Sequence, residues 1–254
     1  MMETPKNSID AVATTFDILE VLKENGAMGI TELTSEVDVS KGTVHNHLST
    51  LLHEDYVVRE GDKYRLGFRF MDLAHHAKGR VEVYDLVSRE VDKLAEQSGE
   101  MALYTQVEHG LGVCLYRAMG ENAVQTALYE GHRSTLHHTA VGKAILSQLP
   151  REEVEAIIEH RGLEPQTDAT ITDPEELFAE LEEVRERGLA FNQGETLPGL
   201  VGVGAPLTDR HGDVAGAISV IGPVGRLDED QFYGEIPDMI TRSVNIIEIN
   251  ATSL

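Results

Sequence analysis

Cysteine, long apolar runs and lysine are all scarce in this 254-residue chain. The single cysteine, Cys114, has no partner for an internal disulfide and no neighbouring cysteine for a zinc or redox motif, so we expect it to be a small buried hydrophobe in a strand. No apolar run approaches the roughly 20 residues that span a bilayer. The first residues, MMETPKNSID, lack the basic and apolar regions of a signal peptide. These absences predict a cytoplasmic protein with no membrane partner.

Basic residues are outnumbered, with 21 Lys and Arg against 44 Asp and Glu and a net charge of −23. Such a balance ordinarily argues against a nucleic-acid partner. Residues 1–70 hold 7 basic and 12 acidic residues, a net charge of −5, so the other 184 residues carry −18. Lysine stands at only seven positions. This composition resembles that of proteins from salt-accumulating halophiles, for which DNA binding depends less on a basic surface; an acidic mesophilic protein is the alternative.

The common catalytic motifs are missing as well. A phosphate loop of the form GxxxxGK[ST] fails at both ends around Gly142 and Lys143, because position 137 is His and position 144 is Ala. No Gly-x-Ser-x-Gly elbow is present, although carboxylates are too abundant for spacing alone to exclude a catalytic pair. The clustered histidines lack the HxxxH spacing of metal ligands: His75, His76, His132, His137 and His138. We therefore predict no enzyme, no cofactor and no metal.

The most informative stretch is residues 29–66, whose apolar residues form two short helical sets separated by a tight turn at Asp38 and Val39. Ser40 is placed to cap the second helix. The sets are Ile30, Leu33 and Val37, then Val44, Leu48, Leu51 and Leu52. This layout predicts a helix-turn-helix.

The outward face of the second helix has the chemistry of a DNA reader. With the apolar stripe turned inward, it presents Lys41, Gly42, His45, Asn46 and Ser49, and no acid occurs between Ser40 and His53 to repel phosphates. We predict base and backbone contacts from Ser40, Lys41, Gly42, Thr43, His45 and Asn46.

Two alternating runs, 56–59 and 63–66, follow this helix and predict a β-hairpin that would form the wing of a winged helix. Arg59, Lys63 and Arg65 lie near its tip, where they could hold phosphates or the minor groove. A small three-helix module used for protein contacts would share the same pattern. The predicted DNA-binding domain is residues 1–66.

The rest of the chain predicts a linker helix at 67–80 and a second domain at 81–254. An apolar stripe at Ile9, Val12, Phe16, Leu19 and Leu22 predicts a helix that closes the first domain's core. In the second domain, strands are expected at 101–107, 111–118, 123–128, 189–195, 200–207 and 214–221, with helices at 82–97, 138–149, 151–160, 174–187 and 228–250. The predicted fold class is a mainly α winged helix-turn-helix domain followed by an α+β domain with an antiparallel sheet.

Several segments, taken in order along the chain, resemble the IclR family of transcriptional regulators. The recognition helix matches at Ser40-Lys41-Gly42-Thr43-Val44-His45, and the wing ends in Tyr64-Arg65-Leu66-Gly67. Later matches are His138 to Ala144, Glu195 with Gly199-Leu200, Ala205-Pro206, Ala217-Ile218-Ser219 and Gly222-Pro223. Two positions depart from the family pattern. Asn46 stands where the family usually has Arg, and Asn pairs preferentially with adenine whereas Arg pairs with guanine. Gly202 stands where many members have a cysteine in the pocket.

The resemblance implies a GAF-like or profilin-like second domain that binds a small molecule, often an organic acid, an aromatic acid or a sugar-derived metabolite. The first turn after Thr139 favours an anion because its backbone N–H groups are free. The predicted ligand contacts are Thr139, Ala140, Val141, Gly142, Asn192, Glu195, Leu200, Gly202, Ser219 and Ile221. Thr139 as a simple cap, Ser219 as a core hydroxyl and Glu195 in a local ion pair are the alternatives.

We therefore expect a DNA-binding transcriptional regulator whose double-stranded operator binding responds to a small-molecule effector, acting as a dimer or tetramer. One alternative is a metabolite sensor or small-molecule enzyme whose winged helix makes protein contacts. Another is a metal or redox sensor that uses Cys114 and the histidines.

Overall fold

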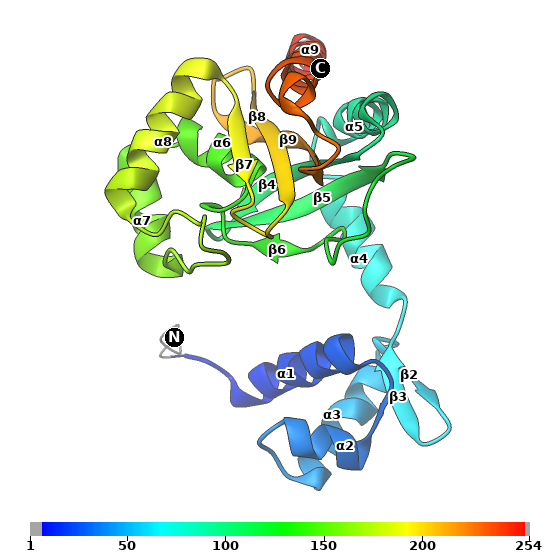
Figure 1. Cartoon of the computed structure of the whole chain (residues 1–254). Helices are drawn as coiled ribbons and strands as arrows, with labels where there is room; N and C mark the ends of the chain where they lie inside the picture. Colours follow the sequence, from blue (N-terminus) through cyan, green and yellow to red (C-terminus); the bar gives the residue numbers. More distant parts are fainter. Residues whose placement is uncertain (1–6, 252–254) are drawn as a thin grey trace. The chain divides into compact units, whose positions relative to one another are not determined.

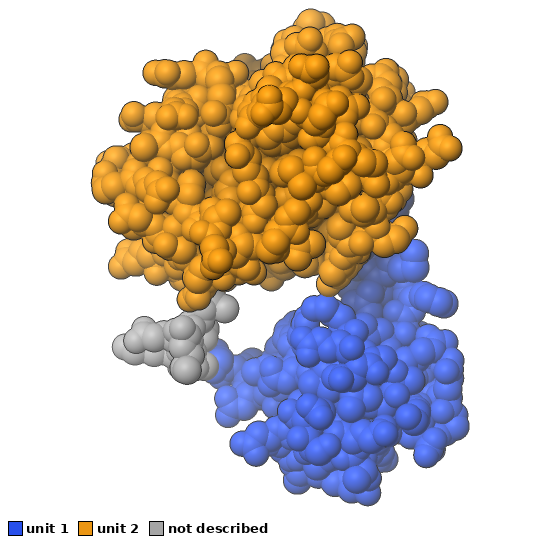
Figure 2. Space-filling model, viewed as in Figure 1, with its two compact units in different colours: residues 1–81 blue, residues 82–254 orange. Residues whose placement is uncertain are grey.

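The structure is a computed structural model that describes residues 7–251, and the chain divides into two compact units, residues 1–81 and 82–254 (Figure 1, Figure 2). Within the described residues, no helix combines the length and the apolar character needed to cross a membrane. The predicted fold class is confirmed: a helix-turn-helix unit is followed by an α+β unit with an antiparallel sheet.

Unit 1 is a winged helix-turn-helix. Its helices are α1 (Asp10–Asn25), α2 (Ile30–Glu36), α3 (Lys41–His53) and α4 (Arg69–Lys78), and a small antiparallel sheet has the order β1-β3-β2, with β1 Met28–Gly29, β2 Val57–Glu60 and β3 Lys63–Leu66. Side-chain hydrogen bonds to backbone N–H groups cap the first turns of α2 and α3. The Glu32 carboxylate accepts a hydrogen bond from Gly29 N–H at 2.7 Å, and Ser40 Oγ accepts one from Thr43 N–H at 3.2 Å.

The core of unit 1 corrects the predicted stripe on α1. Ile18 and Leu22 are buried in this core, together with Leu33, Val44 and other residues of α2, α3 and the wing. Ile9, Val12 and Phe16 were expected in the core but are at least half exposed. The spacing of apolar residues predicts one continuous buried face, but only the C-terminal half of α1 packs against α2 and α3. The apolar residues at the N-terminal end of α1 remain exposed.

Unit 2 is built on one six-stranded antiparallel sheet of order β6-β5-β4-β9-β8-β7. Its strands are β4 Met101–Glu108, β5 Leu111–Met119, β6 Arg133–Ser134, β7 Ala190–Gln193, β8 Leu200–Thr208 and β9 Val214–Pro223. Its helices are α5 Tyr84–Ser98, α6 Ala140–Gln148, α7 Arg151–Arg161, α8 Pro174–Arg187 and, after the short π-helix η1 Gln231–Glu235, α9 Ile236–Ala251.

Alternation along the central strands divides unit 2 into layers (Figure 1). Leu103 and Ala217 join the core beneath α6 and α8, whereas α5 and α9 pack on the other side of the same strands. Because successive residues of a strand point to opposite faces, each central strand serves both layers. Cys114 is 3% exposed in β5, which confirms its prediction as a small buried residue in a strand.

One predicted strand is wrong. Residues 123–128 form no strand, and β5 pairs instead with the two-residue strand β6, through Gly112 with Ser134 and Val113 with Arg133. The apolar character of 123–128 has another use, because Thr126, Ala127 and Leu128 line a cavity in unit 2. Burial against a cavity and burial in a strand give the same short apolar pattern.

Gly142 lies at a close contact between α6 and the backbone that precedes it, and this contact can be tested by mutation. An added Cβ there would lie 2.0 Å from the Leu136 carbonyl oxygen, so the backbone before α6 would have to move. We expect Gly142→Ala to lower the free energy of unfolding by about 3 kcal/mol or more in urea titrations. Gly225→Ala is the matched control, since a Cβ there meets no atom within 4 Å. Equal stability of the two variants would contradict the close contact between Gly142 and the Leu136 backbone.

Candidate functional site

The outer face of α3 carries the predicted DNA-contact residues. His45 and Asn46 are exposed on consecutive positions, while Val44 and Leu48 on the opposite side are buried. Ser40 accepts from Thr43 N–H as the cap, and its Oγ also lies 2.9 Å from Thr43 Oγ1. The hydroxyl that was expected to reach DNA therefore already has a helix-capping role.

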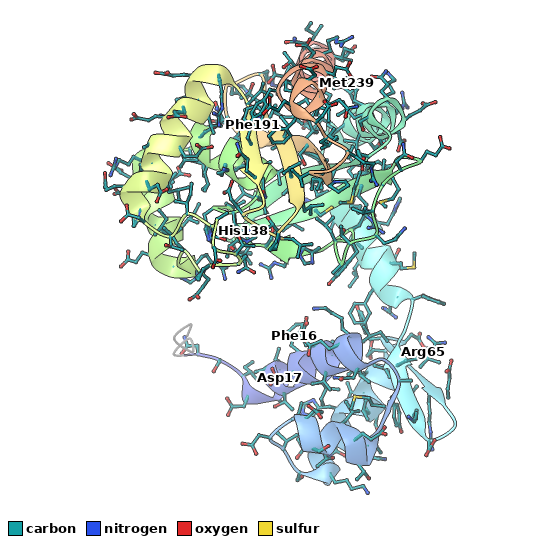
Figure 3. The ribbon with its side chains drawn as sticks, in the orientation of Figure 1. Phe16, Asp17, Arg65, His138, Phe191 and Met239 are labelled. Atoms are coloured by element: carbon teal, nitrogen blue, oxygen red, sulfur yellow. The ribbon has the colours of Figure 1, made fainter. Side chains whose placement is uncertain are left out.

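The other predicted contacts flank this face. Lys41 Nζ donates to Thr31 Oγ1 at 3.1 Å, which ties α3 to α2, and Gly42 is exposed with only Ser40 Oγ near its missing Cβ. In the wing, Arg59 donates to the Gly61 carbonyl, Lys63 lies 3.7 Å from the Glu32 carboxylate, and Arg65 (Figure 3) pairs with Glu60 at 2.7 Å. These ion pairs are exposed, so they are weak and can be exchanged for phosphate contacts. Arg65 also donates to a neutral carbonyl, that of Leu66, at 3.1 Å.

Unit 2 holds a cavity of about 260 Å³ between its sheet and the first turn of α6. Eight of the ten predicted ligand-contact residues line it: Thr139, Ala140, Val141, Asn192, Leu200, Gly202, Ser219 and Ile221. They come from α6 and its N-cap, β7, β8 and β9, so segments far apart in the sequence converge on one space.

Gly142 and Glu195, the other two, do not line the cavity. Gly142 faces the Leu136 backbone, and its N–H already donates to the capping oxygen Thr139 Oγ1 at 3.0 Å. Glu195 instead accepts from Lys143 Nζ at 2.7 Å, in agreement with the local ion pair considered for it. Burial raises the pKa of the Glu195 carboxyl, and the neighbouring Lys143 ammonium offsets this in part.

Sequence reasoning missed more than half of the cavity wall. Most of the missed residues belong to β4, β5 and the segment that follows β5, and three belong to the turn after β7 or to β8: Met101, Leu103, Thr105, Gly112, Cys114, Thr126, Ala127, Leu128, His132, Ser134, Thr196, Leu197 and Val201. The alternation of β4 and β5 could have indicated which side chains share a face. It could not have shown that α6 leaves part of that face uncovered.

The cavity's rim is held by a network of short polar bonds around Asn192. Its Oδ1 accepts from Gly194 and Glu195 N–H, and its Nδ2 donates to the His138 carbonyl and to Thr196 Oγ1. The His138 Nδ1 atom lies 3.1 Å from Thr196 Oγ1 as well. This network fixes the turn after β7 against the segment that precedes α6.

His138 (Figure 3) is the most perturbed base of this network. It is 5% exposed, and burial lowers its pKa to about 4, with a smaller contribution from the neighbouring His137. Burial lowers the pKa of His137 too, whose Nε2 lies 3.1 Å from the Glu164 carbonyl. Both rings are therefore neutral near pH 7 and act as hydrogen-bonding parts of the structure.

Two family profiles cover most of the chain. Residues 75–247 match the bacterial transcriptional regulator IclR C-terminal domain, and residues 11–61 match the IclR helix-turn-helix domain. The probable HTH-type transcriptional regulator ArcR of Halobacterium salinarum is 35% identical over 245 residues, which cover 95% of this chain and 93% of the relative. The transcriptional repressor IclR of Escherichia coli is 28% identical, with 83% of this chain and 78% of the relative covered.

Solved structures share the fold over nearly the whole chain. The Thermotoga maritima IclR structure has a TM-score of 0.81 at 24% identity and covers 96% of this chain and 99% of its own. An IclR homologue from Microbacterium hydrocarbonoxydans, solved in complex with 4-hydroxybenzoate, has a TM-score of 0.83 at 19% identity, with 96% and 100% covered. At these identities the likeness supports the fold alone.

The lowered pKa of His138 predicts a pH dependence of stability. Between pH 6.5 and 4 the unfolded chain binds a proton at this residue and the folded chain does not, so stability falls as the pH falls through this window. The shift corresponds to about 3 kcal/mol. We expect His138→Gln to flatten the slope of unfolding free energy against pH over this range, measured by urea titration. His160→Gln, an exposed position on α7, should keep the wild-type slope. Because the pKa of His137 is lowered too, part of the slope should remain in His138→Gln, and a slope equal to that of the wild type would contradict the assignment.

Proposed function

Because this chain belongs to the IclR family of transcriptional regulators, we propose that α3 reads the bases of an operator and that a small organic acid in the unit 2 cavity controls this binding. DNA binding by the helix-turn-helix domain and effector binding by the C-terminal domain are the activities of the family, and the chain is a regulator and not an enzyme. We place its action in the cytoplasm, where its operator would be.

The observation that carries the DNA proposal is the acid-free outer face of α3. His45 and Asn46 are exposed there with no carboxylate from Ser40 to His53, in a chain whose net charge is −23. A recognition helix contacts base edges with the N-terminal part of its exposed face. We propose that Asn46 pairs with adenine in the major groove, and that His45, Thr43, Lys41 and the wing cations contact bases or phosphates around it.

Asn46→Ala tests this assignment by separating sequence preference from total affinity. A bidentate Asn–adenine pair contributes roughly 1–3 kcal/mol of discrimination, so the ratio of affinities for the DNA upstream of the chain's own gene and for scrambled DNA should fall about tenfold or more. Affinity for scrambled DNA should change little, since phosphates supply it. Fluorescence anisotropy in molar potassium chloride measures both.

Asn25→Ala is the matched control, because Asn25 is exposed at the end of α1 and donates to the Val21 carbonyl. It should leave both affinities unchanged. An equal loss on both DNAs in Asn46→Ala would show that Asn46 does not read sequence.

We further propose that two copies associate through the uncovered apolar surface of unit 1. At α1 this surface comprises the N-cap residue Ile9 together with Val12 and Phe16 (Figure 3), which are 67%, 50% and 61% exposed. At α4 it comprises the N-cap residue Phe68 together with Met71, which are 78% and 68% exposed, and the described α4 has no buried residue. Homodimer interfaces are richer in apolar area than ordinary surface, and a two-fold dimer presents two recognition helices to a pseudo-palindromic operator.

Phe16→Asp should therefore lower the association state, as measured by sedimentation velocity, and weaken operator binding about tenfold or more, because the two half-sites are no longer bound together. Ala11→Asp adds the same charge at an exposed position on the opposite side of α1 and should change neither quantity. An unchanged sedimentation profile in Phe16→Asp would place the contact elsewhere.

For the effector, the supporting observation is Ser219. Its Oγ is fully buried, lines the cavity and has no hydrogen-bond partner among the described residues. An unpaired buried hydroxyl is rare because it costs free energy, and a bound ligand would satisfy it. We propose an organic acid as the class of effector; the Microbacterium hydrocarbonoxydans homologue, which shares the fold, was solved with such an acid, 4-hydroxybenzoate.

A further inference from the structure

One wall of the unit 2 cavity brings together a thiol, an imidazole and a hydroxyl. Thr105 and Cys114 are register partners on β4 and β5, and both line the cavity. On the other side of Cys114, its N–H donates to the His132 carbonyl at 3.0 Å, and His132 lines the cavity as well. Residues that face each other across neighbouring antiparallel strands have Cβ atoms about 4.5–5.5 Å apart. The three side chains therefore stand next to one another at the edge of one space.

The hydroxyls beside the thiol are available to a ligand. Thr105 is 3% exposed, yet within the described residues no hydrogen bond involves its side chain. A buried hydroxyl without a partner costs free energy, so it indicates a ligand that accepts from it. Ser134 Oγ, which has no partner in the same part of the chain, lies 3.7 Å from the position of a Cβ on Gly112. Because Gly112 has no side chain, the space between these two hydroxyl-bearing residues stays open beside Cys114.

Cys114 can be reached only from inside the cavity. The residue is 3% exposed, whereas Leu197 and Ala127, which line the same cavity, are exposed. The cavity therefore opens to solvent near Leu197 and Ala127, and its volume of about 260 Å³ admits small molecules and excludes polymers. A small molecule that enters meets the thiol within a wall that shields it from larger reagents.

We propose that Cys114 is a site of covalent modification by small α,β-unsaturated carbonyl compounds that enter this cavity, and that the adduct alters operator binding. The site goes beyond the reversible effector of the proposed function, because it forms a covalent bond. Only the effect of the adduct on DNA rests on that function.

This wall supplies a group for each part of the reaction. In the unmodified protein the Cys114 thiol donates to the Tyr116 carbonyl at 3.6 Å. His132 takes the thiol proton, and the thiolate sulfur bonds to the β-carbon while the electron pair of the double bond moves onto the carbonyl oxygen. The Thr105 and Ser134 hydroxyls are the donors for that oxygen as its negative charge develops. The proton on His132 then passes to the α-carbon, so nothing leaves and no oxidant is needed.

Intact-mass spectrometry on the full chain tests the site directly, because Cys114 is the only cysteine. Samples of the folded protein in molar potassium chloride are treated with methyl vinyl ketone, with its saturated analogue butanone, or with a maleimide attached to a polyethylene glycol polymer. The urea-unfolded chain gives the reference rate for each reagent. We expect one methyl vinyl ketone adduct, no butanone adduct, and a folded-to-unfolded rate ratio at least tenfold lower for the polymer than for the ketone.

Two results would overturn the inference. If the folded protein forms no adduct at Cys114 while the unfolded chain does, the cavity gives no access to the thiol. If the polymer and the small ketone have equal rate ratios, the thiol reacts when the domain opens and not through the cavity. Cys114→Ser should form no adduct, which assigns the added mass to this residue.

His132→Gln tests the proposed base. Addition of methyl vinyl ketone should be about tenfold slower or more near pH 7, because the thiol then has no neighbouring group to take its proton. The difference should shrink as the pH is raised toward about 10, where hydroxide ionises thiols. His160→Gln, exposed on α7, is the matched control and should keep the wild-type rate. A wild-type rate in His132→Gln at pH 7 would show that His132 is not the base.

Fluorescence anisotropy on the DNA upstream of the chain's own gene tells failure of the inference from failure of the proposed function. Modification should change the affinity of the wild type about fivefold or more, and methyl vinyl ketone should not change that of Cys114→Ser. An adduct that leaves specific DNA binding unchanged overturns the inference and leaves the proposed function standing. If the untreated protein shows no sequence preference, the proposed function fails, and adduct formation through the cavity still supports the site.

Discussion

The buried cation of Lys143 is the interaction on which the cavity side of unit 2 depends. Lys143 stands in the middle of α6 at 2% exposure, with its Nζ 2.7 Å from the Glu195 carboxylate and 3.3 Å from that of Glu180 on α8. Removing one partner of such a pair leaves a charge buried and unpaired, which costs far more than the pair contributes. The Lys143 ammonium, through its two carboxylate partners, therefore holds three segments together: α6, the turn after β7, and α8.

This connection explains why a short turn can form part of a ligand site. Residues 194–197 have no regular structure after β7, yet Lys143 holds the side chain of Glu195 and Thr170 Oγ1 donates to its carbonyl at 2.7 Å. Asn192 then fixes the turn's N–H groups. A rim that is fixed before the ligand arrives loses little conformational freedom on binding, so more of the contact energy contributes to affinity.

The helices of both units were predictable because capping residues in the sequence mark where helices begin. Ser40 and Thr139 are caps in the sequence and in the structure, and Asp173 accepts from Glu175 and Glu176 N–H at the start of α8. The predictions were wrong where burial depends on parts of the chain that are distant in the sequence. Phe16 follows the apolar spacing of α1 but faces outward, and 123–128 reads as a strand although it lines a cavity. The site was predictable at the start of α6 and, through the family resemblance, on β7, β8 and β9. It was hidden on β4 and β5, since only the fold decides which residues of these strands a helix leaves uncovered.

The two-sided use of the central strands has an evolutionary consequence. Along β9, Ser219 and Ile221 face the cavity, while Ile218 and Val220, which alternate with them, are fully buried on the other side of the sheet. A point mutation at a cavity position changes what the domain recognises and leaves the packing of α5 and α9 untouched. Lineages that carry this fold can thus acquire new chemical signals one residue at a time, with the scaffold inherited intact.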